Sequence, residues 1–91
     1  MRDKFTGKLI EVQLLKDPTK LYYRHSNFYC RVAKSNLTMN EIGMYRIEFI
    51  GKSLYTNTME NFTLTASSRS KLADLFYLES EMREQFPEVF I

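Results

Sequence analysis

The chain has 91 residues, which is enough for one domain with a single hydrophobic core and leaves no room for a second. Hydrophobic residues make up 44% of the chain and charged residues 26%, so the composition is that of a globular protein and argues against intrinsic disorder. One cysteine excludes an internal disulfide, and the net charge of +2 is small for a protein dedicated to duplex DNA.

The first expected element is a strand over residues 8–15. Ile10, Val12 and Leu14 alternate with more polar neighbours, a period of two that is typical of a half-buried strand. Pro18 then ends the strand, because proline has no N–H group for a ladder.

Four further stretches favour strands. Residues 21–34 alternate in character and form either two strands that turn at residues 25–27 or one long strand with a bulge. The most regular alternation covers residues 44–50. Residues 53–58 and 61–65 are rich in Thr, Tyr, Phe and Leu, which suit strands.

A helix is expected over residues 68–86. Ser67, Ser68 and Ser70 are candidate N-caps. An apolar stripe at helical spacing follows them, and Pro87 ends the helix. Residues 87–91 form an apolar tail that either folds back onto the core or docks on a partner.

This order of elements predicts an α+β fold in one domain, residues 1–91. Short connections between strands indicate a small antiparallel sheet of three to five strands within residues 5–65. The C-terminal helix would cover one face of that sheet. A partly open small β-barrel with a C-terminal helix is the alternative.

Catalysis and metal binding find little support among the residues. Zinc needs three or four Cys, His or carboxylate ligands, whereas the chain has one histidine, His25, and one cysteine, Cys30. Cys30 lies in an apolar pattern and is expected in the core rather than as a nucleophile. The motif Gly51-Lys52-Ser53 lacks the preceding glycine of a phosphate-binding loop, where Arg46 stands. We therefore expect a protein that is not an enzyme and that needs no cofactor.

One stretch does suggest a function. Residues 20–39 contain four Lys or Arg and no acid, with three tyrosines interleaved. Cations for the backbone and aromatic faces for the bases are the mixture that single-stranded nucleic acid binders use. Arg46 would extend the patch on the next strand. The predicted nucleic-acid-binding residues are Tyr23, Arg24, Tyr29, Arg31, Lys34 and Arg46.

The alternative function is a regulator or inhibitor that docks on a protein through the helix stripe or the apolar tail. The candidate contact residues for a protein partner are Leu78, Met82, Val89, Phe90 and Ile91. Surplus apolar surface of this kind is also consistent with a homodimer. A lone cysteine and a charged N-terminal stretch that no apolar segment follows predict a cytoplasmic location without a membrane partner.

Charge is uneven along the chain. Residues 1–58 hold ten Lys or Arg and five Asp or Glu, whereas residues 59–91 hold three Lys or Arg and six Asp or Glu. The β-rich part is therefore basic and the C-terminal part acidic. Such an asymmetry can steer a charged partner to one side of a molecule, although a solvated acidic helix face gives the same pattern.

Overall fold

A computed structural model describes residues 2–39 and 42–90. The elements in chain order are α1 (Lys4–Lys16), the 3-10 turn η1 (Pro18–Lys20), β1 (Leu21–His25), β2 (Phe28–Met39), β3 (Tyr45–Ser53), β4 (Met59–Ala66), α2 (Arg69–Ala73), β5 (Tyr77–Leu78), α3 (Glu79–Gln85) and the 3-10 turn η2 (Pro87–Phe90). No helix in the described part of the chain is long and apolar enough to cross a membrane.

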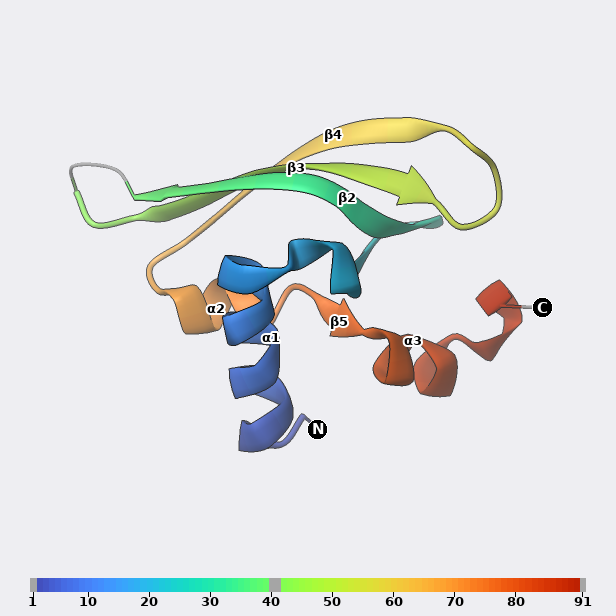
Figure 1. The fold of residues 1–91 in the computed structure, drawn as a ribbon, viewed down its shortest axis with the longest axis horizontal. Helices are drawn as coiled ribbons and strands as arrows, with labels where there is room; N and C mark the ends of the chain where they lie inside the picture. The colour runs from blue at the N-terminus through green and yellow to red at the C-terminus, as the bar shows by residue number, and fades with distance from the viewer. Residues whose placement is uncertain (1, 40–41, 91) are drawn as a thin grey trace.

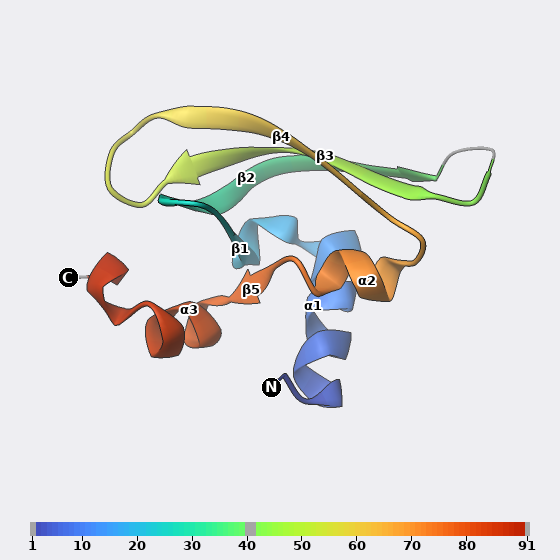
Figure 2. The same cartoon turned by 180° about the vertical axis from the view of Figure 1, so that it is seen from behind.

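The five strands form one antiparallel sheet in the order β4-β3-β2-β1-β5. This confirms the predicted α+β class with an antiparallel sheet. The sheet is open, with β4 and β5 at its edges, so the barrel alternative is not adopted. Figures 1 and 2 show β2, β3 and β4 arching over α1 and α2, which lie together on one side.

The hydrophobic core lies between the sheet and these two helices. Ile10 and Leu14 come from α1 and Leu72 from α2, and they meet side chains of the sheet face that we call the inner face. The buried inner-face residues are Leu21, Tyr23, Cys30, Val32, Ile47 and Phe49. Phe76, in the loop between α2 and β5, completes this core and is fully buried.

The predicted strand over residues 8–15 is wrong, because this segment belongs to helix α1. Asp3 caps the helix: its Oδ1 accepts a hydrogen bond from the Thr6 amide at 2.7 Å. The two buried residues, Ile10 and Leu14, are four apart, so they share a helix face as well as a strand face. A short apolar run that satisfies both periods is decided by packing, here against α2.

The predicted helix over residues 68–86 is interrupted. Its N-cap is Ser68, one of the three expected, whose hydroxyl accepts from the Lys71 amide at 3.2 Å. The first helix ends at Ala73, and Tyr77 and Leu78 then pair with Tyr22 and Leu21 as strand β5. Ladder hydrogen bonds to β1 outweigh the helical propensity of this stretch. The second helix, α3, ends before Pro87, as predicted.

The choice left open for residues 21–34 is settled in favour of two strands. They turn at Ser26 and Asn27, where Ser26 adopts the left-handed backbone conformation with φ 54°. Strand β2 also carries a bulge, because its register with β3 shifts between Val32 and Lys34. The extra residue, Ala33, changes which face the following side chains occupy.

Candidate nucleic-acid interface

The face of the sheet opposite the core, which we call the outer face, is made of regular rows of side chains across β2, β3 and β4. The register pairs them as Arg31–Lys52–Met59, Lys34–Ile50–Asn61, Asn36–Glu48–Thr63 and Thr38–Arg46–Thr65. Only Ile50 among these twelve is half-buried, and the others are exposed. The helices α1 and α2 lie on the other side of these strands (Figure 1).

Five of the six predicted nucleic-acid-binding residues have their side chains on the outer face. Arg24 and Tyr29 oppose each other on β1 and β2, and Arg31 follows Tyr29 two residues later. Lys34 is brought to this face by the bulge, since simple alternation from Arg31 would have placed it inside. Arg46 lies in the row farthest from Arg31.

Tyr23, the sixth predicted residue, lies in the core. Its side chain is 8% exposed, and its ring centroid lies 5.1 Å from those of Phe49 and Phe62 and 5.7 Å from that of Phe76. A ring packed in this way has no free face for a nucleobase. Residues alternate sides along β1, so Tyr23 is on the inner face whenever Arg24 is on the outer one.

Positive charge on the outer face is concentrated at one end. Arg31 and Lys52 are direct cross-strand neighbours, and Lys34 lies in the adjoining row. None of these three forms an ion pair within residues 2–39 and 42–90. At the other end, Arg46 is balanced by Glu48, with 2.6 Å between Arg46 Nη2 and Glu48 Oε1.

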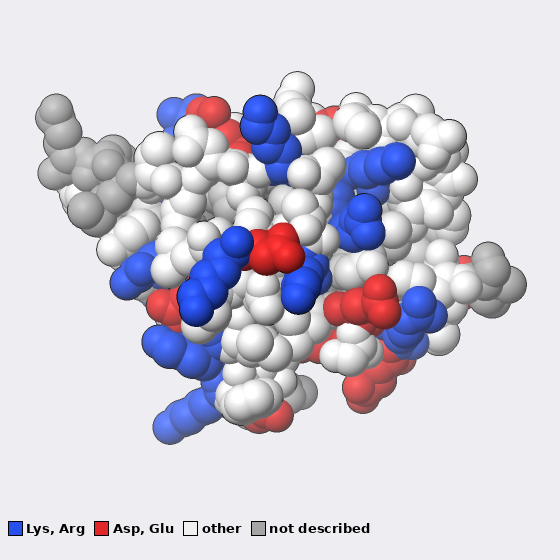
Figure 3. Space-filling model, viewed as in Figure 1, with Lys and Arg blue, Asp and Glu red and all other residues white. Residues whose placement is uncertain are grey.

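Lys52 is a residue that sequence reasoning missed. It stands opposite Arg31, which only the strand register reveals. Figure 3 shows the wider distribution in one view: Lys and Arg side chains lie over the sheet and α1, and the largest acidic group lies over α3. The difference between a basic β-rich part and an acidic C-terminal part is thus visible in space.

Exposed aromatic surface lies beside the Arg31–Lys52 pair. Tyr55, in the turn between β3 and β4, is 58% exposed, and its ring centroid lies 6.1 Å from that of half-buried Tyr29. Ser53 Oγ holds this turn by accepting from the amides of Tyr55 and Thr56 at 3.1 and 3.2 Å. A hollow of about 360 Å³ runs from Tyr22 and Arg31 to this turn. Sequence reasoning missed Tyr55, which has no periodic pattern to mark it.

The C-terminal segment covers the remaining aromatics of the outer face. Phe86 packs on Tyr29, with ring centroids 5.2 Å apart, and the Arg24 guanidinium lies 5.2 Å from the Phe86 centroid. Phe90 packs against Tyr22, with ring centroids 6.0 Å apart. The apolar tail therefore folds back on the chain, which is one of the two arrangements predicted for it.

A polar contact fixes the same segment. The Tyr22 hydroxyl donates a hydrogen bond to Glu79 Oε1 at 2.9 Å, and Arg83 Nε donates to Glu79 Oε2 at 3.3 Å. Burial, followed by the bond to Glu79, raises the pKa of Tyr22 above its usual value. The hydrogen bonds from Tyr22 and Arg83 lower the pKa of Glu79. Glu79 is therefore ionised at neutral pH and marks the acidic border of the basic outer face.

Most of the predicted protein-contact residues are used inside the chain. Met82 is fully buried and Val89 is buried, while Leu78 packs against the core. Phe90 is half-buried, and the Arg83 guanidinium lies over its ring, 4.3 Å from the Phe90 ring centroid. Ile91 lies outside the described residues. In this fold the side chains of Met82 and Val89 are not available to a protein partner.

Cys30 is part of the core, as predicted. Burial is the main cause that raises the pKa of its thiol, from 9.0 to about 12. Its Sγ–H donates to the Tyr23 carbonyl at 3.4 Å, and a Cβ on Gly51 would overlap its sulfur. No group of three or more His, Cys, Asp or Glu in the described part of the chain could hold a metal ion.

The state of the Cys30 thiol gives a first testable prediction. At pH 9.0 a thiol with a pKa of 9.0 is half ionised, whereas with a pKa of about 12 only about one Cys30 thiol in a thousand is ionised, roughly 500-fold less. We expect Cys30 to react with a disulfide reagent only when the protein opens, so that 6 M urea restores full reactivity. A native rate equal to the rate in urea would contradict the buried position.

Comparison of the chain with protein-family models, with curated proteins and with solved structures finds no match.

Proposed function

We propose that this protein is a non-catalytic module that binds single-stranded nucleic acid on its outer face. The observation that carries the proposal is the Arg31–Lys52 pair, two cations without an ion-pair partner in the described residues, beside the exposed ring of Tyr55. Like charges directly opposite each other on neighbouring strands destabilise a sheet. A phosphate placed between them would turn that repulsion into attraction.

The arrangement favours a single strand over a duplex. Each base of a single strand offers a free face, and stacking on an aromatic ring contributes about 1–3 kcal/mol per base. Tyr55 and the free part of Tyr29 provide such faces next to Arg31, Lys34 and Lys52. A duplex keeps its bases stacked inside, and within residues 2–39 and 42–90 no helix projects from the outer face of β2, β3 and β4 to enter a groove.

The charge requirement is tested by removing the Arg31–Lys52 pair. With a fluorescently labelled eight-nucleotide uridine strand, we expect Arg31→Ala with Lys52→Ala to weaken binding by at least tenfold in 50 mM salt. The slope of log K against log salt should also fall by about 1.4, the contribution of two phosphate contacts to a single strand.

The matched control is Arg69→Ala with Lys71→Ala on α2, which changes the net charge equally at exposed positions off the outer face. This control should keep both the affinity and the salt slope near those of the unmodified protein. Equal loss in both double variants would show only general charge attraction. Absence of salt-dependent binding in the unmodified protein would reject the proposal.

The aromatic requirement is tested at Tyr55. Replacement of Tyr55 by Ala should weaken binding of the same strand about tenfold, because a stacked base loses its platform. Tyr55→Phe keeps the ring and should bind within about twofold of the unmodified protein. Weak binding by both variants would mean that the hydroxyl, and not the ring, makes the contact.

A further inference from the structure

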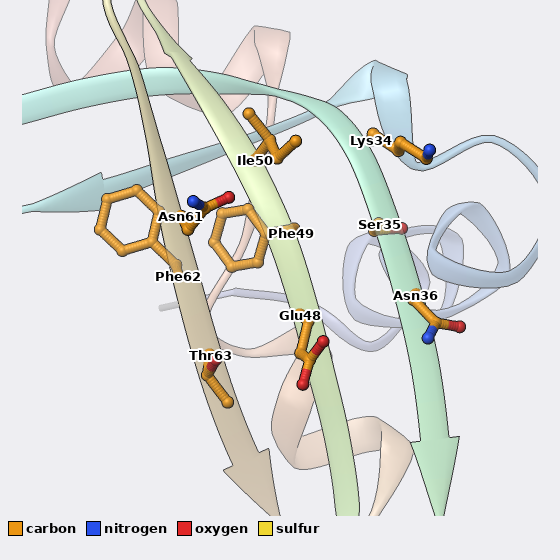
Figure 4. Close-up of a pocket in the computed structure, with 9 residues that line it drawn as sticks. All are labelled: Lys34, Ser35, Asn36, Glu48, Phe49, Ile50, Asn61, Phe62 and Thr63. Carbon is orange, nitrogen blue, oxygen red and sulfur yellow. The ribbon is translucent and has the colours of Figure 1, made fainter.

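The outer face has a second feature next to the Arg31–Lys52 pair. A hollow of about 450 Å³ lies across β2, β3 and β4. Its two sides are the rows Lys34–Ile50–Asn61 and Asn36–Glu48–Thr63. The row between them, Ser35–Phe49–Phe62, forms its floor with backbone, because these residues alternate with the outer-face ones along each strand. Figure 4 shows the nine lining residues on their three strands.

The hollow combines one carboxylate with two amides and one aliphatic side chain. Glu48 supplies acceptors, Asn36 and Asn61 supply both donors and acceptors, and half-buried Ile50 supplies an apolar contact. Lys34 stands at the side nearest to Arg31 and Lys52. A flat heterocycle with hydrogen-bonding edges and a nearby phosphate fits this set of groups.

The acceptor oxygens of Glu48 decide which heterocycle fits the hollow. An ionised carboxylate is an acceptor only, with about four lone-pair sites. Arg46 Nη2 lies 2.6 Å from Glu48 Oε1 and takes one of these sites, which leaves acceptor capacity on both oxygens. The carboxylate therefore selects a ligand edge with two adjacent donors.

We propose that this hollow binds a guanine base of the single strand, an inference that rests on the proposed function. Guanine alone presents two adjacent donors, N1–H and N2–H, on its Watson–Crick edge. Adenine, cytosine and uracil each place an acceptor beside the donor, which the Glu48 carboxylate repels. Single-stranded RNA is commonly read by hydrogen bonds to such splayed-out base edges.

The position of the hollow agrees with this assignment. Its near side is the row that adjoins Arg31–Lys52, and successive outer-face rows are roughly 7 Å apart along a strand. A phosphate held by Arg31 and Lys52 and the base of an adjacent nucleotide in the hollow can therefore belong to one strand.

The experiment compares eight-nucleotide uridine strands that carry one central guanine, adenine or cytosine, measured by competition against the labelled all-uridine strand. We expect the guanine strand to bind about tenfold more tightly than the all-uridine strand, and the adenine and cytosine strands to bind within about threefold of it. The same series in thymidine DNA distinguishes RNA from DNA, and guanosine monophosphate alone distinguishes a strand from a free nucleotide.

The test variant is Glu48→Gln, which keeps the shape but replaces one acceptor by a donor. It should abolish the guanine preference and leave all-uridine binding unchanged or stronger, because Arg46 is released from its partner. The matched control, Glu60→Gln, loses the same charge from exposed β4 outside the hollow and should keep the preference.

The outcomes separate the two proposals. Salt-dependent binding of all strands with equal affinity would overturn the guanine assignment and leave the proposed function standing. Failure of every strand and of guanosine monophosphate to bind would reject the proposed function and the guanine site together. If guanosine monophosphate binds, loses this binding in Glu48→Gln, and no strand binds, the hollow is a site for a free nucleotide. This result would overturn the assignment to a nucleic-acid strand.

Discussion

Replacement of Phe76 by alanine should lower the free energy of unfolding by about 4 kcal/mol, the range found for aromatic residues removed from cores. Phe76 is fully buried, and its ring centroid lies 5.3 Å from that of Phe49 and 5.7 Å from that of Tyr23. It joins the loop after α2 to the inner face of the sheet. Its removal would leave a cavity where the sheet and the C-terminal part of the chain meet.

Urea denaturation followed by circular dichroism measures this loss. For a domain of this size the melting temperature should fall by about 20 °C. Phe76→Leu retains most of the volume and should cost about 1.5 kcal/mol, so the difference between the two variants reports the cavity. A loss below 1 kcal/mol in Phe76→Ala would mean that the core closes around the gap, or that the Phe76 side chain does not lie in the core.

The α+β class with its antiparallel sheet was predictable because the central strands carry a strong local signal. Ile47 and Phe49 alternate with Arg46 and Glu48 in β3, and the structure buries the first pair and exposes the second. An apolar residue at every second position indicates a strand with one face packed on a hydrophobic core. Such positions depend little on the rest of the chain.

The helix at the N-terminus was not predictable from the same rule. Ile10 and Leu14 fit a spacing of four as well as a spacing of two, and the intervening Val12 favoured the strand. The stronger signal was Asp3, whose side chain caps the helix from outside the apolar run. The decision between the two periods comes from contacts with α2, which lie almost 60 residues away in the sequence.

The break in the C-terminal helix has the same kind of cause. Nothing in the sequence from Asp74 to Leu78 forbids a helix, and no proline or glycine marks the interruption. The backbone of Tyr77 and Leu78 instead completes the edge of the sheet beside β1. A pairing between two short segments so far apart leaves no periodic pattern in either.

The candidate interface was predictable as a composition but not as a surface. Arg24, Tyr29 and Arg31 were selected by residue type, and they lie on one face because they follow the alternation of β1 and β2. Lys34 reaches that face only through the bulge at Ala33, and the position of Lys52 opposite Arg31 is set by the register between β2 and β3. Partners on separate strands are properties of the sheet and are not carried by any local segment.

The second large effect is expected at Arg2, which holds three segments together. Its guanidinium donates to the carbonyls of Ala73 and Phe76, at 3.0 and 2.5 Å, and to both carboxylate oxygens of Glu81, at 3.0 and 3.1 Å. The side chains of Arg2 and Glu81 are only 17% and 15% exposed. Arg2→Ala should lower the free energy of unfolding by about 3 kcal/mol, because Glu81 and two carbonyls lose a shared donor.

The geometry makes Arg2→Lys a poor substitute. An ammonium group cannot supply the planar set of donors that reaches four acceptors at once, so lysine should restore less than half of the loss. Lys4→Ala removes the same charge from an exposed position on α1 and should cost less than about 0.5 kcal/mol. Equal stability of the Arg2→Lys and unmodified proteins would reduce the role of Arg2 to its charge.

A double-mutant cycle between Arg2 and Glu81 tests the contact itself. Glu81 also accepts from the Leu78 amide at 3.0 Å, which caps α3, so Glu81→Ala should be costly alone. Removal of Arg2 in that background should cost about 1–2 kcal/mol less than in the unmodified protein, since no half-buried carboxylate is left unpaired. Because the pair is mostly buried, 0.5 M salt should leave this coupling largely intact. Additive losses would mean that the two side chains act independently and that the carbonyl contacts alone anchor the start of α1 to the C-terminal part of the chain.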